Sequence, residues 1–259
     1  MTLDITDSHT HLDHPDFNGE EDSIVERALA VGVTRIITVG ANDGFASAET
    51  AIRLSEKFSC VWASVGVHPI DGATPFDIGR LKSLTQHPRV VAIGETGLDF
   101  YYPDGAPAHV QEQWFRSQIV LAKEIKKPLI IHSRNAAIRC LQILIEEGAS
   151  EVGGVFHCYS EDAAFAEKLR AINFLVSFPG PITFKKADAL RVIASNIPLE
   201  QIMVETDAPY MAPEPYRGRR CESAFVVETA RALAIAKGVS LEKVAEVTTA
   251  NAKRLFNIS

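Results

Sequence analysis

The feature that most constrains the fold is an alternation of short apolar runs with longer helical patterns along the chain. The apolar runs have the length and β-branched content of buried parallel strands. About eight runs are recognisable, at residues 3–6, 34–39, 61–66, 90–94, 129–132, 154–157, 174–177 and 202–205. The stretches between them, such as 111–125, show the spacing of amphipathic helices. This order predicts an α/β fold.

Repeated strand–helix units with short connections favour a closed (β/α)8 TIM barrel. An open, doubly wound sheet is the alternative, because one miscounted strand would leave the barrel unclosed. The tail, 222–256, predicts two helices that separate at Gly238, with Ser240 as the cap of the second. No linker, low-complexity segment or charge block interrupts the pattern. We therefore expect residues 1–259 to form a single domain.

Composition places the chain among ordinary globular proteins, with 46% hydrophobic and 23% charged residues. A net charge of −7 argues against a constitutive, high-affinity binder of nucleic acid, but not against an enzyme that meets a phosphodiester locally. No secretory leader or membrane-spanning run is evident, so we expect a cytoplasmic protein without membrane contact. Scattered cysteines without a CxxC pair suit a reducing compartment. The oligomeric state stays open, with a monomer slightly favoured.

Polar residues at the ends of the predicted strands carry the information about function. His9 and His11 follow the first run two residues apart, so in extended backbone both rings point to one side. Neutral imidazole binds zinc and related ions well, although a lone HxH is a weak signal. Further strand ends each add one metal-binding side chain: Glu95, His132, His157 and Asp207. Because the carboxyl ends of barrel strands meet at one face, these side chains are expected to converge there.

Four histidines and two carboxylates are sufficient to hold two adjacent divalent cations, with Zn, Mg or Mn as candidates. Glu95 is the predicted bridge, because a carboxylate offers two oxygens. The remaining predicted ligands are His9, His11 and Asp207 for one cation, and His132 with His157 for the other. Water between the cations is the predicted nucleophile, and Asp207 is predicted to take its proton.

Residues near the predicted centre are candidate substrate contacts. His68 follows the third strand and could donate to a phosphoryl oxygen, or be a structural histidine beside Pro69. Arg134 and Arg217 are candidate phosphate contacts from loops, against a solvated-surface alternative. Glu205 is expected on the same side of the strand as Asp207. It could contact a metal ligand without binding metal itself, or it could contact substrate. The tyrosines that could stack on bases of a single strand are Tyr101, Tyr102 and Tyr159.

Six ordered motifs resemble those of the TatD-type metal-dependent deoxyribonuclease family. They are DSHTHLD at 7–13, VGVHP at 65–69, GETGLDFY at 94–101, PLIIHSR at 128–134, VFHCYS at 155–160 and ETDAPYMAP at 205–213. The resemblance continues to the segment 251–256 and so covers nearly the whole chain. It implies a TIM-barrel hydrolase with two divalent cations and the same six ligands. It also implies 3'-5' exonuclease-like cleavage of nucleic acid, with single-stranded DNA as the expected substrate.

The chain departs from the family pattern in loops around the predicted centre. Asn135 stands where the family usually has Asp, Glu161 where it has Gly, and 221–223 read Cys-Glu-Ser where Asn-Glu-Pro is common. No departure removes a predicted ligand, but together they put substrate preference in doubt.

Three other functions stay open. A barrel amidohydrolase or lactonase could use the same cations, although such enzymes often bridge them with a modified lysine, and here the fourth and fifth strands end in Glu95 and His132. A D-aminoacyl-tRNA deacylase is compatible with the same resemblance. A non-catalytic binding module is the third, and the retention of all six ligands argues against it.

Overall fold

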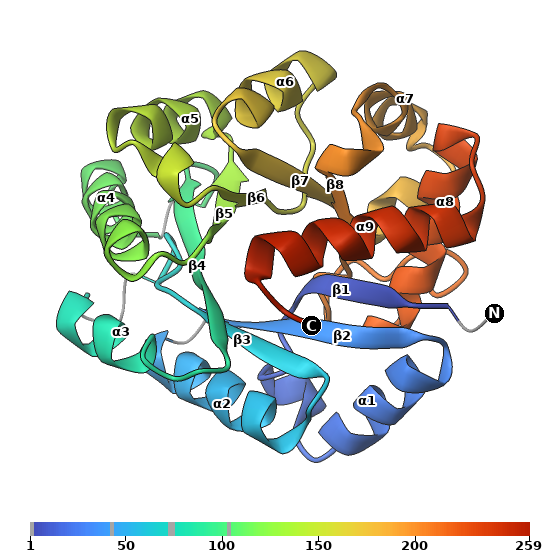
Figure 1. Ribbon diagram of the computed structural model, residues 1–259, viewed down its shortest axis with the longest axis horizontal. Helices are drawn as coiled ribbons and strands as arrows, with labels where there is room; N and C mark the ends of the chain where they lie inside the picture. The colour runs from blue at the N-terminus through green and yellow to red at the C-terminus, as the bar shows by residue number, and fades with distance from the viewer. Residues whose placement is uncertain (1–2, 42–43, 72–75, 103–104) are drawn as a thin grey trace.

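Eight parallel strands follow one another around one sheet within residues 3–41, 44–71, 76–102 and 105–259, which the computed structural model describes. Helices surround the strands (Figure 1). The strands are β1 Ile5–Thr10, β2 Val33–Gly40, β3 Val61–Val65, β4 Val90–Asp99, β5 Leu129–Arg134, β6 Gly154–Phe156, β7 Phe174–Phe178 and β8 Ile202–Val204. A doubly wound sheet would reverse its strand order at a switch point. The order here runs from β1 to β8 without reversal, so the predicted TIM barrel is confirmed.

The helices lie between and after the strands, and the predicted pattern at 111–125 corresponds to one of them. They are α1 Glu21–Ala30, α2 Gly44–Lys57, α3 Ile78–Leu84, α4 Ala108–Ile125, α5 Ala137–Glu146, α6 Ala163–Ala171, α7 Asp188–Asn196, α8 Val226–Lys237 and α9 Leu241–Phe256. Short 3-10 turns are η1 Pro15–Phe17, η2 Ala149–Glu151, η3 Gly180–Thr183, η4 Leu199–Gln201 and η5 Ser223–Phe225. The split in the tail is confirmed: Gly238 ends α8 in the left-handed conformation, and the Ser240 side chain accepts from Lys243 N to cap α9.

Two strands run at least four residues past the end that the apolar pattern predicts. The expected ends were residue 6 for the first strand and residue 94 for the fourth, but β1 continues to Thr10 and β4 to Asp99. Except for Leu98, the added residues are polar or glycine, yet they pair with neighbouring strands, as Asp7 does with Ile36 and Gly97 with His132. Hydrophobic patterning misses them because they line the polar mouth of the barrel.

The sheet closes where β8 meets β1. The backbone N–H of Asp207 donates to His9 O at 2.9 Å, and that of His11 donates to Ala208 O at 2.7 Å. Thr10 and Ala208 form a parallel bridge beside these bonds. Closure therefore brings Asp207 next to His9 and His11, which lie almost two hundred residues earlier in the chain.

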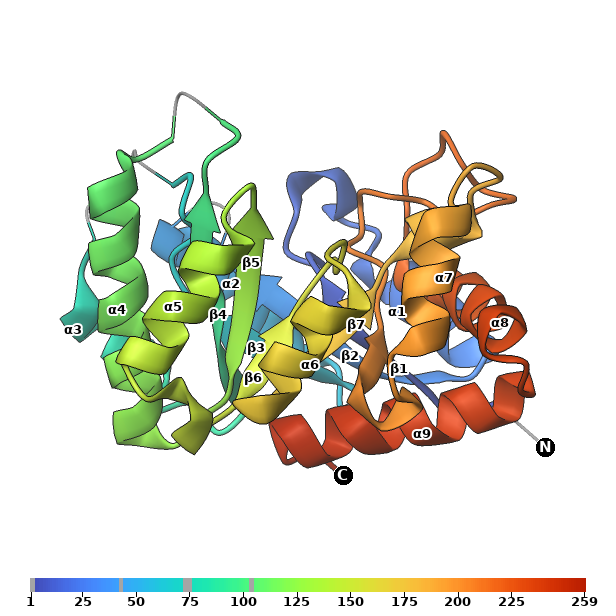
Figure 2. The same ribbon diagram turned by 90° about the horizontal axis from the view of Figure 1, so that it is seen from above.

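One end of the barrel is sealed by α9, which lies across it, while the loops that follow the strands rise from the other end (Figure 2). Phe256 and Ala252 of α9 pack inside the barrel against strand residues such as Ile37 and Ile130. The Asn251 side chain fixes the helix by donating to two backbone carbonyls near β8. Because α9 covers one end of the barrel, only the other end, at the carboxyl ends of the strands, is open for a functional site. No helix of the described residues is both long enough and apolar enough to cross a membrane.

Gly97 allows β4 to approach β5 closely. Its φ is +141°, and a Cβ at this position would lie 2.0 Å from the carbonyl oxygen of His132. We expect Gly97→Ala to lower the free energy of unfolding by about 3 kcal/mol, because the two strands must separate and the backbone is strained. Urea denaturation followed by circular dichroism measures this change.

Gly218→Ala is the matched control. Gly218 also has a positive φ, +86°, but no atom lies within 4 Å of an added Cβ, so only the backbone strain of about 1 kcal/mol remains. Equal losses of stability in the two variants would contradict a role for close strand approach at Gly97.

Candidate metal centre

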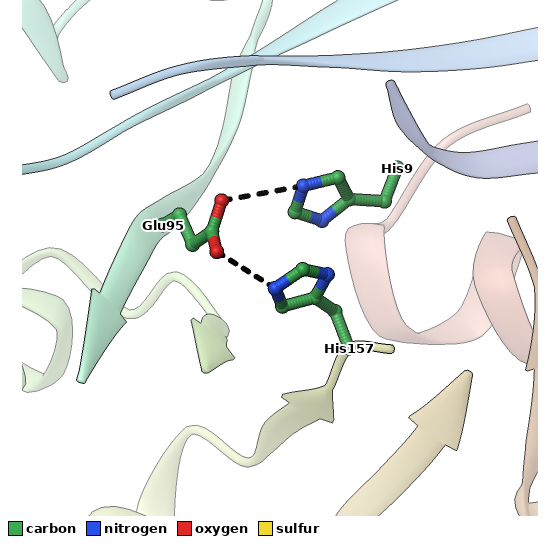
Figure 3. A group of neighbouring side chains, drawn as sticks. All are labelled: His9, Glu95 and His157. Atoms are coloured by element: carbon green, nitrogen blue, oxygen red, sulfur yellow. Dashed lines mark ion pairs between the residues drawn. The ribbon is translucent and has the colours of Figure 1, made fainter. Parts of the chain in front are cut away.

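Glu95, on β4, lies in the middle of the open end of the barrel with 2% of its surface exposed. Figure 3 shows His9 and His157 approaching different oxygens of its carboxylate. His9 Nε2 lies 3.4 Å from Oε2, and His157 Nε2 lies 2.7 Å from Oε1. His11 joins the Oε2 side, with its Nε2 at 3.8 Å. A carboxylate whose two oxygens face different imidazoles has the geometry of a bridging ligand.

His132 and His68 complete the Oε1 side of Glu95. His132 Nδ1 lies 2.7 Å from Oε1, and His68 Nε2 lies 3.4 Å from it. The backbone N–H of Ile70 donates to His68 Nδ1 at 3.2 Å, so a neutral His68 carries its proton on Nε2. Burial, together with the charge of His132, lowers the pKa of His68 to about 4, which keeps the ring neutral. His68 therefore presents an N–H donor toward the centre, which suits a hydrogen bond better than a metal bond.

Asp207 faces His9 and His11 from the segment after β8. Its Oδ1 lies 3.4 Å from His11 Nε2 and 3.7 Å from His9 Nε2, and the two ring nitrogens are 3.3 Å apart. His11 Nδ1 contacts the carbonyl oxygen of Val39 at 2.9 Å, and although burial opposes it, Asp207 raises the pKa of His11 to about 9, so without a cation a proton on His11 Nε2 lies between these groups. Acceptors that face one another without a proton between them repel, and a cation in their midst would stabilise them. The residues thus fit a divalent cation.

Three sets of side chains among the described residues place their ligand atoms within 4.8 Å of one another. They are His9, Glu95 and His157; His9, His11 and Asp207; and His68, Glu95 and His132. All six predicted ligands are brought together, and their binding of metal stays a prediction. The sets differ from the predicted pairing in one respect, because His132 groups with His68 whereas His157 groups with His9.

Within the cluster, the pKa of each ionisable side chain depends strongly on the charges of its neighbours. Although burial opposes its ionisation, the charge of His157 and hydrogen bonds from His132 and His157 hold the pKa of Glu95 well below its usual value. Although burial favours the neutral rings, Glu95 and Glu205 raise the pKa of His157, and Asp99 and Glu95 raise that of His132. A protonated imidazole cannot bind a cation through the same nitrogen. Metal binding at these rings is therefore linked to proton release.

Asp99 is a functional residue that the sequence analysis did not assign. It lies four residues after Glu95 on the same face of β4, and its Oδ2 is 2.9 Å from His132 Nε2. A carboxylate at Nε2 holds His132 so that Nδ1 points at Glu95, as partners behind metal ligands do. The signal was present in the sequence, because in an extended strand residues 95, 97 and 99 project to one side.

Glu205 lies behind His157, which favours the supporting role over the substrate contact among the roles considered for it. It is fully buried, and its carboxylate accepts from the Cys158 N–H at 2.7 Å and from the Ser177 hydroxyl. Its Oε1 is 3.6 Å from His157 Nδ1, too long for a hydrogen bond but close enough for charge to act. Glu205 thus supports His157 and does not reach the barrel mouth.

Asp7 is a second buried carboxylate that the sequence analysis left without a role. It accepts from Thr206 N at 3.0 Å and Thr206 Oγ1 at 2.7 Å, and so joins β1 to the segment after β8. Burial raises its pKa to about 7, against hydrogen bonds from Ser223 and Thr206 that favour the charged form. This bond network fixes the spacing between His9 and Asp207.

Tyr159 is not available for base stacking, which corrects an expectation. Only 3% of it is exposed, its hydroxyl donates to Asp162 O at 2.7 Å, and its ring packs edge-on against Phe178. Arg134 and Arg217 do lie at the surface of the open end. The Arg134 guanidinium lies 3.8 Å from the ring centroid of Tyr101, and that of Arg217 lies 4.2 Å from the centroid of Phe184.

Comparison with known proteins places the chain in a family. A family model described as "TatD related DNase" matches residues 6–257. The chain belongs to the TatD family. A Bacillus subtilis relative, the uncharacterized metal-dependent hydrolase YabD, is 40% identical over 98% of this chain and 99% of its own length. The 3'-5' ssDNA/RNA exonuclease TatD of Klebsiella pneumoniae is 30% identical over 97% of each chain.

Solved structures support the same assignment. The crystal structure of YJJV, a TatD homologue from Escherichia coli K12, superposes with a TM-score of 0.92 at 26% identity and covers all of both chains. The resemblance predicted from six motifs is thereby confirmed across the whole barrel.

Proposed function

We propose that this TatD-family chain is a metal-dependent hydrolase that cleaves phosphodiester bonds of single-stranded nucleic acid through two divalent cations. The observation that carries the proposal is the position of Glu95, whose two oxygens face two different sets of imidazoles. The name of the Klebsiella relative, a 3'-5' ssDNA/RNA exonuclease, supports the substrate class and the direction of cleavage. Divalent cations supply Lewis-acid polarisation of a phosphodiester and make water a stronger acid.

The cluster divides into the ligands of two cations that share Glu95. The set that contains His11 and Asp207 would hold one cation, and His132 with His157 on the Oε1 side would hold the other. Two divalent cations carry more positive charge than Glu95 and Asp207 together carry negative charge. The cations would therefore attract a phosphodiester oxygen locally, although the protein as a whole is acidic.

Two side chains supply proton chemistry. Asp207 is an ionised carboxylate, because the hydrogen bond to His11 and the charge of His9 lower its pKa in spite of burial. It can accept the proton of an attacking water molecule. His68 directs its Nε2–H into the same space and can donate a hydrogen bond to a phosphoryl oxygen.

The test is a substrate panel with the purified protein, stripped by chelation and reloaded with Mg²⁺, Mn²⁺ or Zn²⁺. The panel contains a 5'-labelled single-stranded oligonucleotide, its duplex, an RNA of the same sequence, a lactone, an N-acyl amino acid and a D-aminoacyl-tRNA. We expect metal-dependent shortening of the labelled single strand from its 3' end. Hydrolysis of acyl substrates with no phosphodiester cleavage in any metal would overturn the proposal.

A further inference from the structure

We propose that Tyr101, Tyr102 and Arg134 form a stacking platform for an unpaired base of the strand being cut, next to the metal centre. The inference rests on the proposed function and names the feature of the substrate that the site recognises, a base free of its partner strand. No part of the platform belongs to the proposed metal ligands.

The platform is a fixed arrangement of one cation and two rings. The Arg134 guanidinium lies 3.8 Å from the ring centroid of Tyr101 and 4.8 Å from that of Tyr102, and its Nη1 donates to the Tyr102 hydroxyl at 3.0 Å. The two rings stand 5.1 Å apart at an interplanar angle of 87°. A guanidinium that contacts two aromatic rings and donates to one of their hydroxyl groups has lost part of its conformational freedom, so it binds a further partner at a lower entropic cost.

Asp99 ties the platform to the metal centre. Its Oδ1 accepts from the backbone N–H groups of Tyr101 at 2.9 Å and Tyr102 at 3.2 Å, while its Oδ2 contacts His132. Arg134 lies two residues after His132 at the end of β5, so both side chains project to the same side of that strand. A strand of nucleic acid bound at the cluster can therefore reach the platform.

Much of the surface of the platform is exposed in the described part of the chain. Phe100, Tyr101 and Tyr102 are consecutive aromatic residues with 41%, 54% and 46% of their surface exposed. Arg134 forms no ion pair with any described carboxylate, whereas Arg116 and Arg139 both pair with glutamates. Exposed rings beside an uncompensated cation match a ligand that is both aromatic and anionic. A nucleotide provides a flat base for the rings and a phosphate for the guanidinium.

A cavity of about 680 Å³ begins beside the platform, and it is lined by Arg134 of the platform and by Phe100, the residue before Tyr101. This volume falls in the range of roughly 300–1,000 Å³ that holds small ligands. Ser133, Asn135, Ser160 and Glu161 also line it, and Asn135 and Glu161 are positions at which the chain departs from the family pattern. The cavity offers polar contacts to the nucleotide that follows the stacked one.

The experiment compares a variant without the rings, Tyr101→Ala with Tyr102→Ala, with the conservative variant Tyr101→Phe with Tyr102→Phe. Each is assayed on a single-stranded oligonucleotide and on an abasic oligonucleotide of equal length, which keeps the phosphates and lacks the bases. Since stacking contributes about 1–3 kcal/mol per base, the alanine variant should raise KM for the first substrate about tenfold and leave kcat within a factor of two. The phenylalanine variant should restore KM, and KM for the abasic strand should be the same in all three proteins.

A binding measurement separates failure of the platform from failure of the proposed function. Fluorescence anisotropy with chelator-treated protein reports affinity for the labelled strands without any hydrolysis. If the wild type cuts nothing but binds the normal strand more tightly than the abasic one, and the alanine variant loses that preference, the platform stands and the nuclease proposal falls. If the alanine variant affects normal and abasic strands equally, or affects neither, the platform does not exist.

Discussion

Replacement of Glu95 by glutamine is expected to lower kcat for phosphodiester hydrolysis by about three orders of magnitude or more. Glutamine keeps the shape of the side chain but removes its charge and turns one acceptor into a donor. Within the described chain five imidazole rings approach the Glu95 carboxylate to 3.8 Å or less, so both proposed cations lose a shared ligand. Metal per chain, measured by inductively coupled plasma mass spectrometry, should fall at both positions. The far-ultraviolet circular dichroism spectrum should stay almost unchanged.

The control for Glu95→Gln is Glu222→Gln. Glu222 is also buried, but its carboxylate pairs with Arg27 at 2.6 Å, away from the cluster. This variant should retain its metal content and its turnover, with at most a modest loss of stability. Full activity in a metal-free preparation of Glu95→Gln would rule out the mechanism proposed for this centre.

Asp207→Asn is expected to lower kcat by about two to three orders of magnitude, with a different effect on metal content. Among the described side chains Asp207 belongs only to the set with His9 and His11, so one cation should be lost and the other retained. Titration with Mn²⁺, followed by paramagnetic resonance, should therefore reveal one remaining site in Asp207→Asn and none of comparable affinity in Glu95→Gln.

Asp77→Asn is the matched control for this substitution. Asp77 caps α3 by accepting from Arg80 N at 3.0 Å, and asparagine caps helices about as well as aspartate. The control should behave as the wild type in activity and metal binding. Loss of both cations in Asp207→Asn would contradict the division of ligands between two positions.

The sequence by itself determined the barrel and the identity of the clustered side chains. The carboxyl ends of all strands in a (β/α)8 barrel meet at one face, so a polar residue at a strand end can be placed there without coordinates. Two-residue spacing was sufficient to put His9 and His11 on one side of β1. These conclusions depend only on strand order and strand periodicity, which one chain reveals through its hydrophobic pattern.

Tertiary structure alone decided how those side chains face one another. Spacing along a strand gives the side on which a residue projects but not its distance to another strand, because the stagger between strands sets that distance. For this reason the sequence could not show that Glu95 turns one oxygen toward His9 and the other toward His157. It also could not show that Glu205 and Tyr159 are buried, since both are held by hydrogen bonds and packing that form only when the barrel closes.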